Sequence, residues 1–153
     1  MAQVKEKEAD LKAVFIYNFT KYVDWEVNEP QNEFVIGIIG SSAVTKSLVE
    51  IAKTNSAKNK KISIRRFNSP DEIGNCHVLF ITQKSPFALS SILNKTGKGT
   101  LTISEEDGFA ERGTAFNFII VNDKLKFEAN LKAIDAAGLK ASSQLLKLAI
   151  IVN

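Results

Sequence analysis

Residues 34–40, Phe-Val-Ile-Gly-Ile-Ile-Gly, constrain the fold of this chain more than any other segment. They are apolar without alternation, so a strand formed by them must be covered on both faces. Such a strand belongs inside a parallel sheet that carries helices on either side. The run ends at Gly40, and Ser41 or Ser42 can cap the helix expected next, which carries its apolar residues from Val44 to Ala52.

Strand and helix signals continue to alternate after this run. Strands are predicted at residues 61–67, 76–82 and 100–104, with helical segments that start at Pro70 and at Ser85-Pro86 between them. Short links between alternating strands and helices are typical of a doubly wound sheet.

The two ends of the chain add further elements. Before the first strand, apolar residues at helical spacing predict an amphipathic helix over residues 11–23, with Trp25 at its end. Near the other end, Asn122-Asp123-Lys124 separates two apolar segments and predicts a hairpin turn. A turn at residues 131–136, then Gly138 and a closing helix with apolar positions from Leu139 to Ala149, are expected last.

These elements predict an α/β fold: a three-layer, doubly wound, mostly parallel sheet with helices on both faces and an antiparallel hairpin near the C-terminus. The length of 153 residues suits a single domain. We expect a polar extension at residues 1–10 and one α/β domain over residues 11–153, without repeats or linkers.

Composition argues against several classes of partner. The chain has 20 Lys and Arg against 17 Asp and Glu, a net charge of +3, which is too small an excess to predict nucleic-acid binding. No apolar run approaches the roughly 20 residues that span a bilayer, so the chain is not expected to cross a membrane. Cys76 is the only cysteine and cannot form an intrachain disulfide.

Three enzyme-like patterns fail on specific residues. Residues 40–47 resemble a phosphate-binding loop, but Thr45 stands before Lys46 where that loop needs glycine. A phosphoacceptor domain needs an Asp at a strand end, and the central strands run into Gly40 and Thr82 instead. Neighbouring strand residues point to opposite faces, so the adjacent Cys76 and His77 cannot form a nucleophile–base pair. We therefore expect no enzyme, no cofactor and no metal site.

Loop 105–113 is the strongest candidate for contact with a ligand or partner, because loops after strands usually carry binding sites in open α/β sheets. Two glycines, Gly108 and Gly113, bracket an aromatic residue and two opposite charges. Those charges could bind a partner or simply face water. Asn117 and Glu128 could contact a ligand or brace the loop, and Ser142 and Ser143 could form a site or cap a helix. The candidate contact residues are Phe109, Glu111, Arg112, Asn117, Glu128, Ser142 and Ser143.

Several segments also form an ordered set of motifs. Residues 11–25 end in Lys-Tyr-Val-Asp-Trp, and residues 75–81 read Asn-Cys-His-Val-Leu-Phe-Ile. Residues 106–118 contain Gly-Phe-Ala-Glu-Arg-Gly, and residues 138–149 contain Gly-Leu-Lys-Ala-Ser-Ser. Together with segments 34–40 and 127–131, they resemble the YfiR/HmsC-like family of periplasmic regulatory domains over residues 11–152.

The resemblance implies an exported, non-enzymatic domain whose signal peptide has been removed from this sequence. It implies that the domain sequesters the extracytoplasmic part of an inner-membrane signalling protein such as a diguanylate cyclase, and so lowers cyclic-di-GMP signalling and biofilm formation. Homodimers are known in the family, and a dimer stays open here. Thr114 stands where the family has glycine, and well-studied relatives carry paired cysteines, so their redox response is not carried over to a chain with Cys76 alone.

Two other functions stay open at this point. One is a small-molecule sensor with a pocket near the loop from Gly108 to Gly113. The other is a nucleotide enzyme that uses Lys46.

Overall fold

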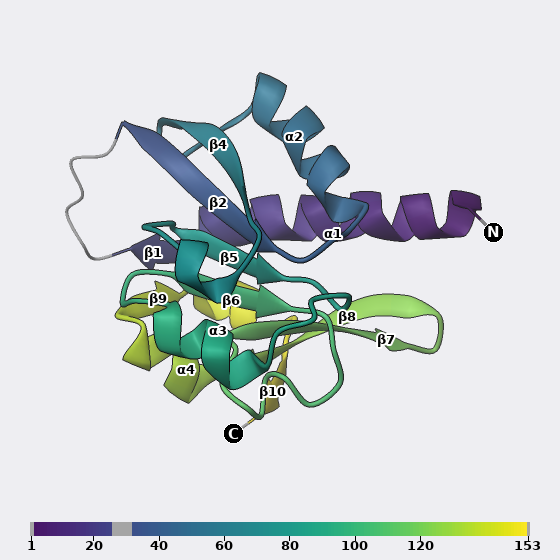
Figure 1. The fold of residues 1–153 in the computed structure, drawn as a ribbon. Helices are drawn as coiled ribbons and strands as arrows, with labels where there is room; N and C mark the ends of the chain where they lie inside the picture. The colour runs from purple at the N-terminus through teal and green to yellow at the C-terminus, as the bar shows by residue number, and fades with distance from the viewer. Residues whose placement is uncertain (1, 26–31, 153) are drawn as a thin grey trace.

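The structure is a computed structural model that describes residues 2–25 and 32–152, with side chains described from Lys7 onward (Figure 1). The helices are α1 (Ala2–Tyr22), α2 (Val44–Thr54), α3 (Leu89–Lys95), α4 (Leu131–Ala136), α5 (Ser143–Leu146) and the short 3-10 helix η1 (Pro70–Glu72). The strands are β1 (Val23–Trp25), β2 (Glu33–Ile39), β3 (Ser56–Ala57), β4 (Lys60–Phe67), β5 (Val78–Ile81), β6 (Leu101–Ser104), β7 (Phe116–Val121), β8 (Lys124–Asn130), β9 (Leu139–Ala141) and β10 (Ile150–Val152).

One eight-stranded sheet organises the fold, in the order β10-β8-β7-β6-β5-β2-β4-β3. Strands β4, β2, β5, β6 and β7 are mutually parallel, whereas β8 is antiparallel to β7 and β3 is antiparallel to β4. A second, two-stranded sheet pairs β1 with β9. The predicted fold class, a mostly parallel sheet with an antiparallel hairpin near the C-terminus, is confirmed.

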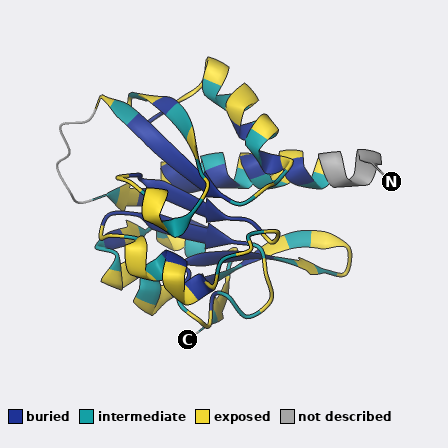
Figure 2. Ribbon diagram, viewed as in Figure 1, coloured by how far each residue is buried: buried dark blue, intermediate teal, exposed yellow. Residues whose placement is uncertain are grey.

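Alternate residues of the central strands supply two separate cores, as a sheet covered on both faces requires. Phe34 and Ile36 of β2 join the larger core, to which α1, α2 and α5 contribute side chains. Val35 and Ile39 join the smaller core with Leu89 and other residues of α3. Figure 2 shows the central strands buried and the outer sides of the helices exposed.

The hairpin between β7 and β8 turns at Asn122 and Asp123, as predicted. Both residues have left-handed backbones, with φ of 51° and 64°, which is the geometry of a type I′ turn. The turn pairs Val121 with Lys124 and sets the register of the whole hairpin, so that Asn117 lies directly opposite Glu128.

The prediction of a closing helix from Leu139 to Ala149 is wrong. Residues 139–149 instead hold β9 and the single-turn helix α5, and β10 follows directly at Ile150. The reason is tertiary pairing: β9 pairs with β1, and β10 pairs in parallel with β8. These partners override the helical spacing of the leucines, which served as the only sequence signal.

Four smaller expectations also need correction. Trp25 lies in strand β1 rather than at the end of a helix, and residues 131–136 form helix α4 rather than a turn. Helix α3 begins at Leu89 rather than at Ser85-Pro86, and the Ser85 side chain accepts a hydrogen bond from the Phe87 amide (3.4 Å) before the helix starts. The residue that caps α2 is Ala43, although Ser42 Oγ does accept a bond from the Val44 amide (3.1 Å).

Helix α1 runs without interruption from Ala2 to Tyr22 and includes the polar residues 2–10. Ala9 is already buried in the larger core.

Candidate functional site

The candidate site lies where loop 105–113 leaves the carboxyl end of β6. In the parallel part of the sheet this edge also holds the ends of β2 and β5, so the loop lies where open α/β sheets usually bind ligands. Ser104, the last residue of β6, pairs with Asn117 of β7, and Asn117 pairs with Glu128 of β8. Three adjacent strands therefore place polar side chains side by side beneath the loop.

Asn117 is the centre of this polar cluster and is fully buried. Its side-chain oxygen accepts hydrogen bonds from Ser104 Oγ (2.7 Å) and from the Glu106 amide (3.1 Å), and its Nδ2 donates to Glu128 Oε1 (3.0 Å). Of the two roles considered for Asn117 and Glu128, the contacts favour bracing: the pair fixes the first residues of the loop to the sheet.

Thr114 completes the cluster. Its Oγ1 lies 2.8 Å from Ser104 Oγ, and both side chains are fully buried. Ser104 has one hydroxyl proton, which it donates to Asn117, so Thr114 must be the donor to Ser104. A glycine at position 114 could not supply this bond.

The far end of the loop is held by Asn130. Its Nδ2 donates to the carbonyl of buried Ala110 (2.7 Å), while its side-chain oxygen accepts from the Ala133 amide (3.0 Å) and caps α4. Gly108 and Gly113 have φ of 83° and 126°, which residues with a Cβ rarely adopt. The loop is therefore a shaped element rather than a loosely held one.

Three predicted contact residues form the outer surface of this loop. Glu111 and Arg112 are exposed, and Phe109 is half-buried against the smaller core. The Arg112 guanidinium lies over the Phe109 ring, 5.2 Å from its centroid, a cation–π arrangement that orients the charge. The arrangement presents an aromatic ring and two opposite charges on a fixed backbone.

Glu105 connects this edge of the sheet to α1, a link that the sequence analysis missed. Lys12 Nζ lies 2.7 Å from Glu105 Oε1 and 2.9 Å from Glu8, and Glu105 Oε2 accepts a bond from the Gln83 amide (2.8 Å). Burial alone would lower the pKa of Lys12, but its hydrogen bonds and charge interactions with Glu105 and Glu8 outweigh that effect and raise its pKa above 10.5.

Ser142 and Ser143 lie away from the loop. Ser142 caps α5 through its side-chain oxygen, which accepts from the Leu145 amide (3.2 Å), and its own amide donates to the carbonyl of Tyr22 (2.8 Å). Ser143 is exposed in the first turn of α5. Lys12 of α1 contacts Glu105 and so lies at the end of the sheet that holds the loop. Tyr22, which Ser142 contacts, lies ten residues, or about 15 Å, farther along the same helix. The capping role is the one that the contacts support.

Cys76 and His77 face opposite cores, as the sequence analysis expected. Cys76 belongs to the smaller core. The His77 ring stacks on Phe34 at 4.5 Å, and its Nδ1 accepts a hydrogen bond from the Val35 amide (3.0 Å). Over the part of the chain that the structure describes, no three His, Cys, Asp or Glu side chains are grouped as metal ligands.

The segment that resembles a phosphate-binding loop is filled by protein. A side chain at Gly40 would overlap Thr82 Oγ1 and crowd Ser85, so these two residues occupy the space beside the backbone. Lys46 is exposed and lines a hollow between α1 and α2 rather than facing Gly40. The packing around Gly40 therefore does not support a phosphate site at this residue.

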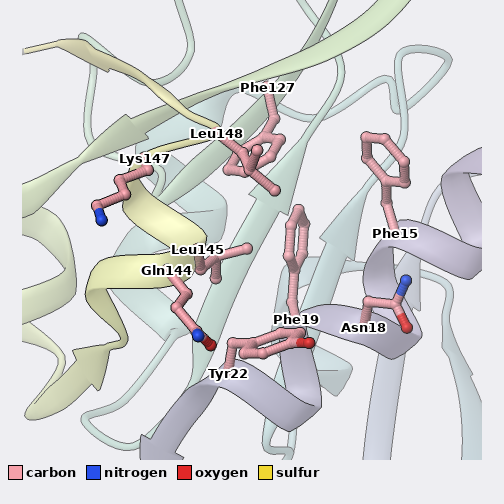
Figure 3. A pocket seen from close by; sticks show the side chains of 9 residues that line it. All are labelled: Phe15, Asn18, Phe19, Tyr22, Phe127, Gln144, Leu145, Lys147 and Leu148. Atoms are coloured by element: carbon pink, nitrogen blue, oxygen red, sulfur yellow. The ribbon is translucent and has the colours of Figure 1, made fainter.

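A groove of about 550 Å³ lies on the opposite face of the sheet from loop 105–113. Its apolar walls come from α1, β8 and the α5 region, and Figure 3 shows Phe19, Phe127 and Leu148 turned toward the same space. The amides of Asn18 and Gln144 lie at its rim in that view. The sequence analysis did not predict this groove, because its walls come from segments more than 100 residues apart.

The sequence pattern of the YfiR/HmsC-like family matches residues 9–150, which is nearly the whole chain. The chain belongs to the YfiR/HmsC-like family. This confirms the resemblance drawn from the ordered motifs. The family is one of periplasmic, regulatory, non-catalytic proteins. A comparison with curated proteins gives no match.

The Gly-Phe-Ala-Glu segment of this chain, residues 108–111, lies in loop 105–113, and Asn117 of the following strand anchors the start of that loop. Among the described helices, none is both long and apolar enough to cross a bilayer.

Proposed function

We propose that this YfiR/HmsC-like domain works in the periplasm by contact, sequestering the extracytoplasmic part of an inner-membrane signalling protein such as a diguanylate cyclase. The family match over residues 9–150 carries this proposal. Binding of that kind would hold the cyclase in a less active state and lower cyclic-di-GMP signalling and biofilm formation.

Loop 105–113 is the contact surface proposed for this function. Its backbone is anchored at both ends by buried amides, Asn117 and Asn130, so it loses little conformational entropy when it binds. Phe109 and Arg112 offer the aromatic and guanidinium groups that are enriched at the energetic centres of interfaces. Glu111 beside them can set the register of a charged partner.

A small-molecule sensor near the same loop is the second candidate. A hollow of about 230 Å³ is lined by Gly113, Leu93 and residues of α4. Ligand pockets usually have volumes of about 300–1,000 Å³, so this hollow is small for a metabolite. The geometry therefore favours contact with a protein.

Calorimetric titration with the purified extracytoplasmic domain of a membrane signalling protein encoded beside this chain tests the proposal. We expect binding that weakens about tenfold or more in Arg112→Ala, since central interface residues often contribute 2 kcal/mol or more. Lys53→Ala is the matched control, because Lys53 is an exposed base on α2 that pairs with nearby Glu50 (2.9 Å). Absence of binding to any such domain would argue strongly against this function.

A further inference from the structure

Strand β10 forms one outer edge of the described sheet. It pairs on one side with β8, through Ile150 with Glu128, Ile151 with Ala129 and Val152 with Asn130. An edge strand offers backbone N–H and C=O groups on its outer side, and another strand can pair with them. Sheets are usually protected at such edges by charged side chains, prolines or bulges. Residues 148–152, Leu-Ala-Ile-Ile-Val, contain no charge and no proline.

The side chains at this edge are unusually apolar for exposed positions. Leu148 is 71% exposed, Ile151 is 45% exposed and Ile150 is 42% exposed. Single exposed apolar residues are common, but three within four residues at a strand edge are typical of an interaction surface.

The register places these residues on both faces of the sheet. Ile151 pairs with Ala129, which belongs to the larger core, so Ile151 lies on the same face as Phe127 and the 550 Å³ groove. Ile150 pairs with Glu128 and lies on the face of loop 105–113. Leu148, two residues before the start of β10, lines the groove itself (Figure 3). In a strand added beside β10, every second side chain would therefore point to the face of the sheet that holds the groove.

We propose that the open edge of β10 and the adjoining groove bind an extended segment of another protein by strand addition. The backbone of the segment pairs with β10, and a large apolar side chain enters the groove between α1 and α5. In strand addition, backbone bonds supply affinity and pockets for alternate side chains supply specificity. Because Phe15, Phe19 and Phe127 line the groove, an aromatic or long aliphatic side chain is the complementary group.

A second copy of this chain suits the surface less well. Pairing of β10 with its own symmetry mate would involve only three residues from each copy. Stable interfaces bury about 1,200–2,000 Å² in total, far more than two three-residue strands supply. An extended segment can continue past β10 and also fill the groove.

The strand-addition site rests on the proposed function in one respect, since the bound segment could belong to the same membrane partner. The first test of the site does not need that partner. A phage library of random linear peptides is selected on the wild-type protein. We expect selected peptides with alternating large apolar residues, and binding of a synthetic copy should slow amide exchange at residues 150–152.

Substitutions then locate the peptide on the surface. Leu148→Lys and Ile151→Lys each introduce a charge at an exposed position, so both should fold normally by circular dichroism and thermal melting. Each should weaken peptide binding about tenfold or more, because burying the charge costs at least 1.4 kcal/mol. Val49→Lys is the matched control, since Val49 is 38% exposed on α2, and it should leave binding unchanged.

The outcomes separate this inference from the proposed function. Failure to select any peptide that protects residues 150–152 would overturn the strand-addition site, whatever the membrane partner does. A wild-type dimer in light scattering that Ile151→Lys converts to monomer would also overturn it, because a second copy would then cover the edge. If a selected peptide binds at β10 but no neighbouring extracytoplasmic domain binds the protein, the site stands and the proposed function fails.

Discussion

Lys12 of α1 and Glu105 at the end of β6 form an ion pair with 2.7 Å between Nζ and Oε1, although 93 residues separate them in the chain. Their side chains are only 12% and 9% exposed. The pair therefore joins α1, which covers the larger core, to the first residue of loop 105–113, the candidate contact surface.

Removal of the ammonium group should destabilise the protein substantially. In Lys12→Met the Glu105 carboxylate stays nearly buried without its cation, and we expect a loss of about 3 kcal/mol in the free energy of unfolding. Urea denaturation measures this loss. Lys53→Met is the control, since the Lys53–Glu50 pair is more than 60% exposed on both sides and should contribute less than about 1 kcal/mol. Equal effects of the two substitutions would contradict the role given to Lys12.

The same pair should make stability depend on pH in the alkaline range. The pKa of Lys12 is raised in the folded protein above its ordinary value of 10.5, so the folded state holds this proton more tightly than the unfolded state. Its contribution is therefore complete below pH 10.5 and is lost as the pH rises through the folded pKa. The stability difference between wild type and Lys12→Met, measured by urea denaturation, should stay constant from neutral pH to about pH 10 and shrink above it. A difference that grows with alkaline pH would have the wrong sign.

Asn117 should control the order of loop 105–113. Asn117→Ala leaves Ser104, the Glu106 amide and Glu128 without a shared partner, and we expect a cost of about 2 kcal/mol in unfolding free energy. Amide hydrogen exchange should become faster at residues 106–114 before it changes in β2 or β5. Asn94→Ala provides the comparison, because Asn94 is exposed on α3 and should tolerate the change. Unchanged exchange in the loop would show that Asn117 does not anchor it.

The turn between β7 and β8 offers a stabilising substitution. Asp123 has a φ of 64°, a left-handed conformation that glycine adopts without strain. Asp123→Gly also creates the Asn-Gly pair preferred in type I′ turns, so we expect about 0.5–1 kcal/mol of added stability in thermal unfolding. Asp71→Gly, at an exposed position in η1, should not stabilise. A lower melting temperature for Asp123→Gly would show that the Asp123 side chain contributes more than its backbone strain costs.

The parts of the fold that the sequence predicted well are those with strong local signals. The unbroken apolar run of residues 34–39 became β2 at the centre of the sheet, and Asn122-Asp123 became the hairpin turn. The turn also determined the register that brings Asn117 opposite Glu128. Local chemistry was sufficient in these cases because burial on two faces and a left-handed turn each leave a distinct pattern.

The last part of the chain could not be predicted in the same way. Strands β9 and β10 have three residues each, too few to show alternation, and each depends on a partner far away in the sequence. The leucines at 139, 145, 146 and 148 have helical spacing, but this spacing is a coincidence. Leu139 belongs to β9, whereas Leu145 and Leu146 belong to α5.

Only part of the candidate site could be foreseen. The residues of loop 105–113 were identified from its glycines and charges, whereas its link to Lys12 and the groove on the other face were not. Nothing in the local sequence indicates that Phe15 lies 6.2 Å from Phe127, or that Lys12 meets Glu105. Such contacts follow from the topology of the sheet rather than from any motif.

The position of α1 has a consequence for how the polypeptide acquires its structure during synthesis. The aromatic rings of the first helix rest on rings near the end of the chain: Phe19 lies 4.6 Å from Phe116 and 5.0 Å from Phe127. Until those late residues have been synthesised, Phe19 lacks these two aromatic partners, although α1 also packs on β2 and α2 in the larger core. The aromatic part of the main core therefore cannot be completed until β7 and β8, and hence most of the domain, have been translated.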